Sequence, residues 1–225
     1  MRTTVTVGKM GRDSVPDVVK VFTEFDSTVS PDLTGLRRRQ LYTYYDVFVH
    51  IQDFLGEDGA VSGGAADDSR IARLGEDLAP FVTAYDPAVS APPSDASASR
   101  FYHWEGAPVD SGKGLHSTVI VNRVASAVIP EVARLFGELD ATDFPFTMGT
   151  RRRQLFEYGG VYFHIQDFEL ENGYALIDQA WKEADPRFIK ICEELDPLVK
   201  KYDPDSWRST ADQVATRFYR WEASA

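Results

Sequence analysis

The chain has 225 residues, of which 43% are hydrophobic and 26% charged, and its formal net charge is −11. This composition is typical of a globular protein, and the acidic balance argues against a nucleic-acid partner, which would require clustered Lys and Arg. Cys192 is the only cysteine, so no disulfide can form within the chain and a reducing compartment is indicated. Residues 1–10 lack the apolar core of a signal peptide, and no apolar stretch approaches the roughly 18 residues of a membrane helix. We therefore expect a cytoplasmic protein that does not contact a membrane.

The first half of the chain alternates between strand and helix patterns. Residues rich in β-branched side chains predict strands, and an apolar spacing of three to four residues after a proline predicts a helix. In chain order, the expected elements are a strand at 2–10, a helix from Pro16, strands at 36–43 and 45–54, a helix near 71–84 and a strand at 100–105.

The second half repeats the first. Residues 16–54 and 130–168 align without a gap at an offset of 114, with 20 of 39 positions identical. A second shared block, at an offset of 117, includes the motif F-Y-x-W-E that ends each copy. A period this long indicates two whole domains rather than a solenoid. We expect a first domain at 1–106, a linker at 107–114 and a second domain at 115–225.

Each copy has the element order β-α-β-β-α-β, which is typical of a ferredoxin-like α+β domain with both helices on one face of an antiparallel sheet. The other sheet face would stay exposed and apolar in a lone copy. We therefore expect the two domains to pack sheet to sheet as an intramolecular pseudo-dimer, of the dimeric α+β barrel type, in a monomeric protein. The copies differ most at 56–68, which is predicted to be a loop, and at 169–185, which can form a packed helix.

The two central strands of each copy predict a cluster of polar side chains. Directly opposed residues of a hairpin have Cβ atoms about 4.5–5.5 Å apart and share a sheet face. A symmetric turn at Tyr44-Tyr45, and the equivalent turn in the second copy, fixes which residues oppose one another. The predicted pairs are Arg39 with His50 and Arg37 with Gln52, and in the second copy Arg153 with His164 and Arg151 with Gln166.

An Arg beside a His suits proton abstraction next to a carbonyl. The guanidinium disfavours the imidazolium, so the His is expected to be a neutral base at pH 7, and the same guanidinium can hold an enolate or oxyanion. Asp26 and Asp140, near the end of the first helix of each copy, are candidate carboxylates for the same cavity. Local capping or pairing explains these two residues equally well.

Other features have structural interpretations. A strand His is often a structural residue, and Arg38 and Arg152 are expected to be solvated or at an interface. Trp104 and Trp221 favour a core role, although they are also candidates for substrate contact. The sequence contains no phosphate-binding Gly-rich loop, no clustered metal-ligand spacing and no G-x-S-x-G motif. We therefore expect chemistry without a cofactor or metal.

The pattern D-x-T…P…G-x-RRR-x-L-[FY]…H, followed by F-Y-x-W, resembles the tetracenomycin-type aromatic polyketide cyclases over nearly all of both halves. The resemblance implies a fused, duplicated version of ferredoxin-like proteins that pair as homodimers and close rings of aromatic polyketides without a cofactor. It also implies a catalytic Asp, Arg and His in each copy. These residues are Asp26, Arg39 and His50 in the first copy, and Asp140, Arg153 and His164 in the second.

The leading hypothesis is a cyclase of type II polyketide biosynthesis that performs intramolecular aldol condensation and dehydration on a poly-β-ketone, either free or tethered to an acyl carrier protein. In it, His164 removes a proton, Arg153 stabilises the enolate and Asp140 assists proton transfer. The second copy is favoured as the working site because its second helix is complete. Two alternatives stay open: a binding module that only shapes the polyketide, and a cofactor-free monooxygenase of the same fold.

Overall fold

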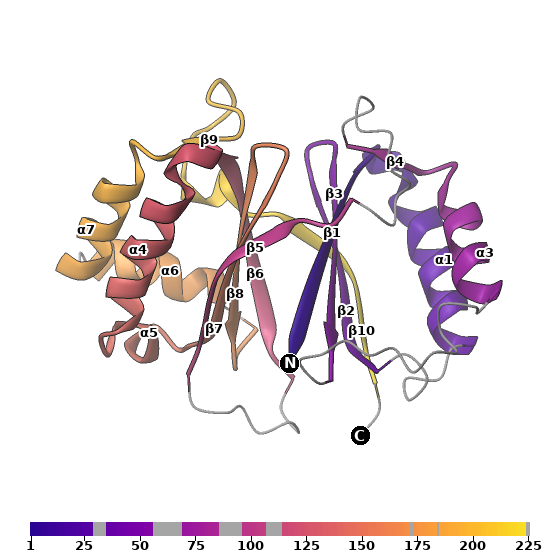
Figure 1. Ribbon diagram of the computed structural model, residues 1–225, viewed down its shortest axis with the longest axis horizontal. Helices are drawn as coiled ribbons and strands as arrows, with labels where there is room; N and C mark the ends of the chain where they lie inside the picture. Colours follow the sequence, from indigo (N-terminus) through magenta and orange to yellow (C-terminus); the bar gives the residue numbers. More distant parts are fainter. Residues whose placement is uncertain are drawn as a thin grey trace. The chain divides into compact units, whose positions relative to one another are not determined.

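The computed structural model describes residues 1–28, 35–55, 69–85, 96–106, 114–171, 173–183 and 185–223. The chain divides into two compact units. Unit 1 comprises Met1–Ala98 with Thr216–Ala225, and unit 2 comprises Ser99–Ala215. Each unit contains one five-stranded antiparallel sheet with helices on one face, as the α+β prediction requires (Figure 1).

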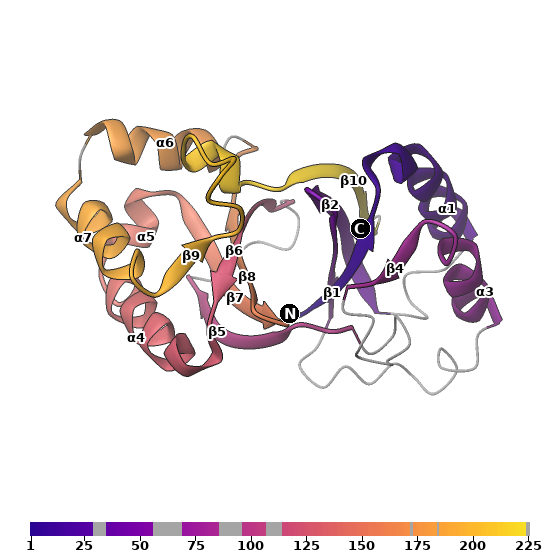
Figure 2. The same ribbon diagram turned by 90° about the horizontal axis from the view of Figure 1, so that it is seen from above.

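Unit 2 has the sheet order β5-β7-β8-β6-β9, and Figures 1 and 2 both show its helices gathered on the same face of that sheet. The apolar side chains of α4 and the facing strands form one core cluster, and α5, α6 and the end of β8 contribute a second. The elements are β5 (Ser99–Glu105), β6 (His116–Val124), η3 (Ser126–Val128), α4 (Ile129–Asp140), α5 (Phe144–Thr147), β7 (Thr150–Tyr158), β8 (Val161–Phe168), α6 (Gly173–Glu183), α7 (Pro186–Leu195), β9 (Val199–Lys201) and η4 (Thr210–Gln213).

Unit 1 repeats this plan with the sheet order β10-β2-β3-β1-β4 and with α1 and α3 on one face (Figure 1). Its core cluster lies between α1 and the sheet and is centred on Val18, Phe22 and Leu41. The elements are β1 (Arg2–Met10), η1 (Arg12–Ser14), α1 (Val15–Thr28), β2 (Leu36–Tyr44), β3 (Val47–Phe54), α3 (Ser69–Leu78), β4 (Val82–Ala84) and β10 (Thr216–Glu222).

The two repeats exchange their last strands. Strand β5, which ends the first repeat, pairs with β7 of the second, and β10, which ends the second repeat, pairs with β2 of the first. The compact units therefore differ from the linear division into 1–106 and 115–225, because each sheet is completed by a strand from the other repeat. The two last strands have nearly the same sequence, so either can fit either sheet edge. Nearly all of the expected linker, residues 107–113, lies outside the described residues.

The second helical region of each repeat is shorter than predicted. Helix α3 ends at Leu78, and the expected helix near 174–200 is interrupted between α6 and α7. Pro186 stands in the first turn of α7, and the Asp185 side chain accepts a hydrogen bond from the backbone N–H of Arg187, so a new helix starts there. Three-residue strands follow in both units, β4 and β9, and they pair with β1 and β6. The sequence analysis missed these two strands because each contains only three residues.

The hairpin register predicted for the central strands is wrong by two residues. The observed turns are Tyr45-Asp46 and Gly159-Gly160, and Tyr45 and both glycines have positive φ, as tight two-residue hairpin turns require. Arg39 therefore lies across from Gln52, and Arg153 across from Gln166, rather than across from a histidine. A shift of two residues keeps every side chain on its predicted face, so each Arg and His are still diagonal neighbours.

Arg38 and Arg152 are expected from the sequence to be solvated or at an interface, and the first of these alternatives is wrong. Both are almost fully buried on the sheet face opposite the helices. The Arg38 Nη2 lies 2.6 Å from Asp53 Oδ2, and the Arg152 Nε lies 2.7 Å from Asp167 Oδ2. A buried guanidinium needs such a partner, because an unpaired charge in the interior is strongly destabilising.

Candidate active site

In unit 2, helix α4 and strands β5, β7 and β8 bring four polar side chains together. The Arg153 Nε donates to both carboxylate oxygens of Asp140, at 3.1 and 2.9 Å, and Nη1 lies 2.8 Å from His164 Nε2. The Tyr102 hydroxyl donates to Asp140 Oδ2 at 3.0 Å. The Phe136 ring lies under the guanidinium, 4.9 Å from its carbon, and packs edge-on against the His164 ring. Asp140, Arg153 and His164 are all buried.

The contact between Arg153 and His164 fixes the histidine tautomer. A guanidinium only donates, so His164 Nε2 accepts from Arg153, and the neutral ring carries its hydrogen on Nδ1. Within the described part of the chain, neither Nδ1 of His164 nor Nη2 of Arg153 has a hydrogen-bond partner. The site therefore presents two unused donors, as a developing oxyanion requires.

Burial dominates the ionisation of these groups. It holds the pKa of His164 well below its ordinary value, and the Arg153 guanidinium acts in the same direction. Burial also raises the pKa of Asp140, although Arg153 and the Tyr102 hydroxyl oppose this by stabilising the carboxylate. The predicted neutral histidine is therefore supported, with burial rather than the guanidinium as the larger cause.

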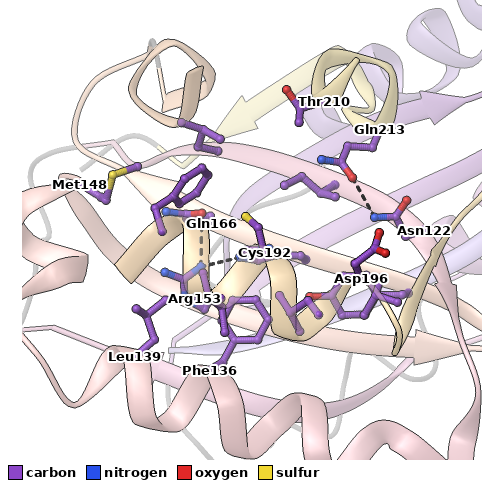
Figure 3. Close-up of a pocket in the computed structure, with 18 of the residues that line it drawn as sticks. Asn122, Phe136, Leu139, Met148, Arg153, Gln166, Cys192, Asp196, Thr210 and Gln213 are labelled. Atoms are coloured by element: carbon purple, nitrogen blue, oxygen red, sulfur yellow. Dashed lines mark hydrogen bonds between the residues drawn. The ribbon is translucent and has the colours of Figure 1, made fainter. Parts of the chain in front are cut away.

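Arg153 and His164 open into a cavity of about 310 Å³ that lies between the sheet and the helices of unit 2 (Figure 3). A volume near 300 Å³ is at the lower end of the range for small-molecule sites. Most of its wall is apolar, and α4, α5, α6 and α7 all contribute to it. Its apolar lining residues include Phe136, Leu139, Phe144, Met148, Ile177 and Ile191.

Unit 1 contains the same arrangement. The Arg39 Nε lies 3.1 Å from Asp26 Oδ1, and Nη1 lies 2.7 Å from His50 Nε2. The Tyr219 hydroxyl donates to Asp26 Oδ2 at 2.8 Å. Burial lowers the pKa of His50 and raises that of Asp26, so the electrostatics match those of unit 2.

Two tyrosines belong to these polar groups and were not among the residues that the sequence predicted for the site. Tyr102 lies on β5 and Tyr219 on β10, so each Asp receives its hydroxyl donor from the last strand of the other repeat. Both copies of the motif F-Y-x-W contain this tyrosine, and that shared position was the one feature of the sequence that could have identified Tyr102 and Tyr219 as candidates. Without the strand exchange, however, neither could be assigned to an aspartate.

The remaining predicted site residues divide into two groups. Gln166 belongs to the site, since its Oε1 lies 3.4 Å from Arg153 Nη1 and its side chain lines the cavity. In unit 1, the equivalent Gln52 lies across from Arg39. By contrast, Arg151 is at a β-bulge and pairs with Glu169, and Arg37 is at the equivalent bulge. The predicted pairs Arg37–Gln52 and Arg151–Gln166 are therefore wrong.

The tryptophans of the repeated motif lie beside the site rather than in the cavity wall. Trp104 is across from Arg153 on β7 but packs edge-on against Phe146, and it does not line the cavity. Trp221 occupies the equivalent place across from Arg39. The cavity described in unit 2 therefore gives no support to a substrate contact for Trp104, and the substrate contact of Trp221 stays a prediction.

Neither a metal centre nor a membrane helix is apparent where the structure is described. No group of three or more His, Cys, Asp or Glu side chains there is arranged to hold a metal ion. In the same parts of the chain, no helix is both long and apolar enough to cross a bilayer.

Comparison with known proteins agrees with the internal repeat. The sequence profile of the family described as polyketide synthesis cyclase matches residues 2–105 and again residues 116–222. The chain belongs to this family. Polyketide synthase CurG from Streptomyces cyaneus is 32% identical over 108 residues, which cover 48% of this chain and 98% of that protein. Tetracenomycin F2 cyclase from Streptomyces glaucescens is 28% identical over 109 residues, covering 48% and 95%.

Each of these two relatives covers about half of the present chain, and the family profile matches the chain twice, so the chain is a tandem duplication of a family unit. Similarity in fold extends further. An anthrone oxidase-like protein superposes with a TM-score of 0.56 over 99% of this chain and 93% of its own, at 10% sequence identity. At that identity, the likeness shows the fold alone.

Proposed function

We propose that this member of the polyketide cyclase family closes a ring of a poly-β-ketone by intramolecular aldol condensation and loss of water. The observation that carries the proposal is the buried group of Asp140, Arg153 and His164, of which Arg153 and His164 line an apolar cavity of small-molecule size. A neutral histidine beside a fixed guanidinium combines a base with an oxyanion holder on one wall. The aldol reaction requires both.

The tautomer indicates the order of events. In the resting site, the His164 Nε2 lone pair is occupied by Arg153. A substrate carbonyl oxygen that accepts from Arg153 Nη1 would compete for this hydrogen bond and release Nε2. His164 then removes a proton from the carbon between two carbonyls, and the electron pair moves to the oxygen held by Arg153.

Ring closure then needs no external reactant. The enolate carbon attacks a ketone carbon of the same chain and forms the carbon–carbon bond, and the new alkoxide takes the proton held by His164. Removal of a further α-proton and departure of the hydroxyl as water gives the double bond. Asp140, whose pKa is raised by burial, lies beside Arg153 and can assist this proton transfer.

Matched variants in the two units test the proposal. Product analysis of a reconstituted polyketide reaction would compare His164→Gln and Arg153→Met with His50→Gln and Arg39→Met, each checked for folding. We expect the unit 2 variants to divert polyketide to shunt products and the unit 1 variants to retain the native ring pattern. The proposal fails if folded His164→Gln and Arg153→Met, alone and combined with the unit 1 changes, direct the same ring closure as the wild type.

The same experiment addresses the two alternatives. A module that only shapes the polyketide predicts that both histidine changes leave the ring pattern intact while changes to the apolar wall alter it. A cofactor-free monooxygenase predicts oxygen uptake in proportion to the product formed. An aldol cyclase consumes no oxygen. An oxygen electrode on the wild-type reaction distinguishes the two enzymes.

A further inference from the structure

Gln166 is held in unit 2 by two hydrogen bonds, one at each end of its amide group. Its Oε1 accepts from Arg153 Nη1 at 3.4 Å, and its Nε2 donates to Thr150 Oγ1 at 2.5 Å. Thr150 is fully buried, and Gln166 is only 4% exposed. Figure 3 shows Gln166 beside Arg153, joined to it by a dashed line, and both residues line the cavity.

These two contacts determine which way the amide faces. A guanidinium can only donate, so the amide oxygen of Gln166 faces Arg153. The amide nitrogen then faces Thr150, whose hydroxyl oxygen accepts one of its two hydrogens. The other amide hydrogen has no acceptor among the described residues. Gln166 therefore brings one unused N–H donor to the cavity wall.

This donor is close to the nitrogen atom that binds the substrate oxygen in the proposed reaction. Arg153 Nη1 contacts both His164 Nε2, at 2.8 Å, and Gln166 Oε1, at 3.4 Å. A carbonyl oxygen that accepts from Nη1 is therefore next to the Gln166 amide. An N–H that is already oriented stabilises the negative charge of an enolate oxygen more than it stabilises a neutral carbonyl.

The internal repeat shows that the threonine belongs to unit 2 alone. The motif G-x-RRRQL occurs in both copies, and its only differing position is Thr150 in the second copy and Leu36 in the first. Thr150 pairs with Phe168 and Leu36 pairs with Phe54, so the two residues occupy equivalent places in their sheets. A leucine side chain cannot accept a hydrogen bond from an amide.

The equivalent glutamine of unit 1 is not fixed in this way. Gln52 is partly exposed, and its side chain has no hydrogen bond to any residue that the structure describes. The contact between Arg and His is nevertheless the same in both units, at 2.7 and 2.8 Å. The two sites therefore share the guanidinium and the imidazole, and they differ in whether the glutamine amide is anchored.

From these observations we infer that Gln166 is a further catalytic residue of unit 2, which donates its unused amide N–H to the enolate oxygen held by Arg153. Thr150 is a positioning residue that orients this amide. The inference rests on the proposed function and deepens it. It also gives a physical reason for a working site in unit 2, because an amide that is already oriented need not be ordered during the reaction.

Equilibrium binding of two probes tests the donor without catalysis. 4-Nitrophenolate is a planar, conjugated oxyanion that resembles an enolate, and 4-nitroanisole has the same ring without the charge. The ratio of their dissociation constants, at a pH where the free phenol is ionised, gives the oxyanion preference of the site. Arg153→Met identifies the part of this preference that belongs to unit 2.

Gln166→Leu should lower the oxyanion preference of unit 2 about 10-fold, since a hydrogen bond to a charged group contributes at least such a factor. Thr150→Val keeps the side-chain shape and removes the hydroxyl, and should lower the preference about 3- to 10-fold because the amide is no longer anchored. Thr150→Ser should restore it. Leu36→Val is the matched control in unit 1 and should leave the preference at its wild-type value.

Steady-state kinetics separates this role from a structural one. In the reconstituted reaction, folded Gln166→Leu and Thr150→Val should lower kcat about 3-fold or more and change KM less than about 2-fold, because the donor acts mainly on the enolate-like transition state. A purely structural contact would lower the melting temperature and leave kcat of the folded protein unchanged.

The outcomes distinguish the inference from the proposed function. The inference is wrong if the wild type does not bind the phenolate, or if folded Thr150→Val keeps both the oxyanion preference and kcat of the wild type. Thr150→Val and Thr150→Ser decide the matter if Gln166→Leu does not fold. If the preference is lost in Gln166→Leu and Thr150→Val but His164→Gln and Arg153→Met do not alter ring closure, the amide donor stands and the aldol chemistry is wrong.

Discussion

Tyr102 and Tyr219 lie on the exchanged strands, and each donates a hydrogen bond from its hydroxyl to an aspartate. A change to phenylalanine removes the hydroxyl and keeps the aromatic ring. Tyr102→Phe removes the donor to Asp140 Oδ2 and keeps the half-buried aromatic ring. A hydrogen bond to a charged group contributes about 1.5–3 kcal/mol, so we expect the free energy of unfolding to fall by that amount. For a chain of this size, the melting temperature should fall by roughly 3–12 °C.

The same change should also affect catalysis, because the Asp140 carboxylate positions the Arg153 guanidinium through two hydrogen bonds. The Tyr102 hydrogen bond lowers the pKa of Asp140, so its loss should raise that pKa further. If the whole lost free energy appears in the transition state, the rate of ring closure falls by about 10- to 150-fold. Denaturant unfolding and a timed product assay would measure the two effects.

Tyr219→Phe is the matched control, since Tyr219 makes the same bond to Asp26 in unit 1 at 2.8 Å. Both variants should lose similar stability, but only Tyr102→Phe should slow ring closure if unit 2 is the working site. The reasoning is refuted if Tyr102→Phe changes neither stability nor rate. If Tyr219→Phe alone slows the reaction, the working site is in unit 1.

Three further predictions concern buried or half-buried groups of unit 2. Because burial lowers the pKa of His164, the unfolded chain binds a proton at this histidine before the folded chain does as the pH falls from 6.5 to 5.5. Wild type should therefore lose up to about 1 kcal/mol more stability than His164→Gln in denaturant titrations, and parallel profiles would contradict this. Burial raises the pKa of Cys192 to about 12, so a thiol reagent at pH 8 should label the native protein far more slowly than the unfolded one; equal rates would show that the thiol is not buried. Arg152→Met should cost about 3–5 kcal/mol of stability, because it removes the guanidinium that neutralises the buried Asp167 carboxylate. Stability should recover in Arg152→Met/Asp167→Leu, and a single variant as stable as wild type would refute the ion-pair argument.

The predicted monomeric state stays a prediction, and so does the packing of sheet on sheet within one chain. Sedimentation velocity at several protein concentrations would measure the first. A mass that rises with concentration would show further association.

The sequence by itself determined the duplication, the strand and helix types, and the grouping of an Arg with a His in each copy. These follow from local information: the alternation of side chains along a strand puts Arg153 and His164 on one face in any even register. The same reasoning failed for the turn of the first copy. A positive φ usually falls on glycine, but here it falls on Tyr45, so the sequence did not mark the turn and the observed hairpin register differs from the predicted one by two residues.

Tertiary structure alone decided the exchange of last strands, the burial of Arg152 against Asp167, and the part of the cavity wall at Asn122 and Gln213. Strand partners are chosen by contacts between residues distant in the chain, and two nearly identical last strands carry no local signal that distinguishes them. Asn122 and Gln213 come from separate elements and align with Gly8 and Ala96 in the first repeat, so comparing the copies could not find them. Local pattern thus specified the elements and the shared chemistry, while long-range packing decided which strand completes each site and what surrounds it.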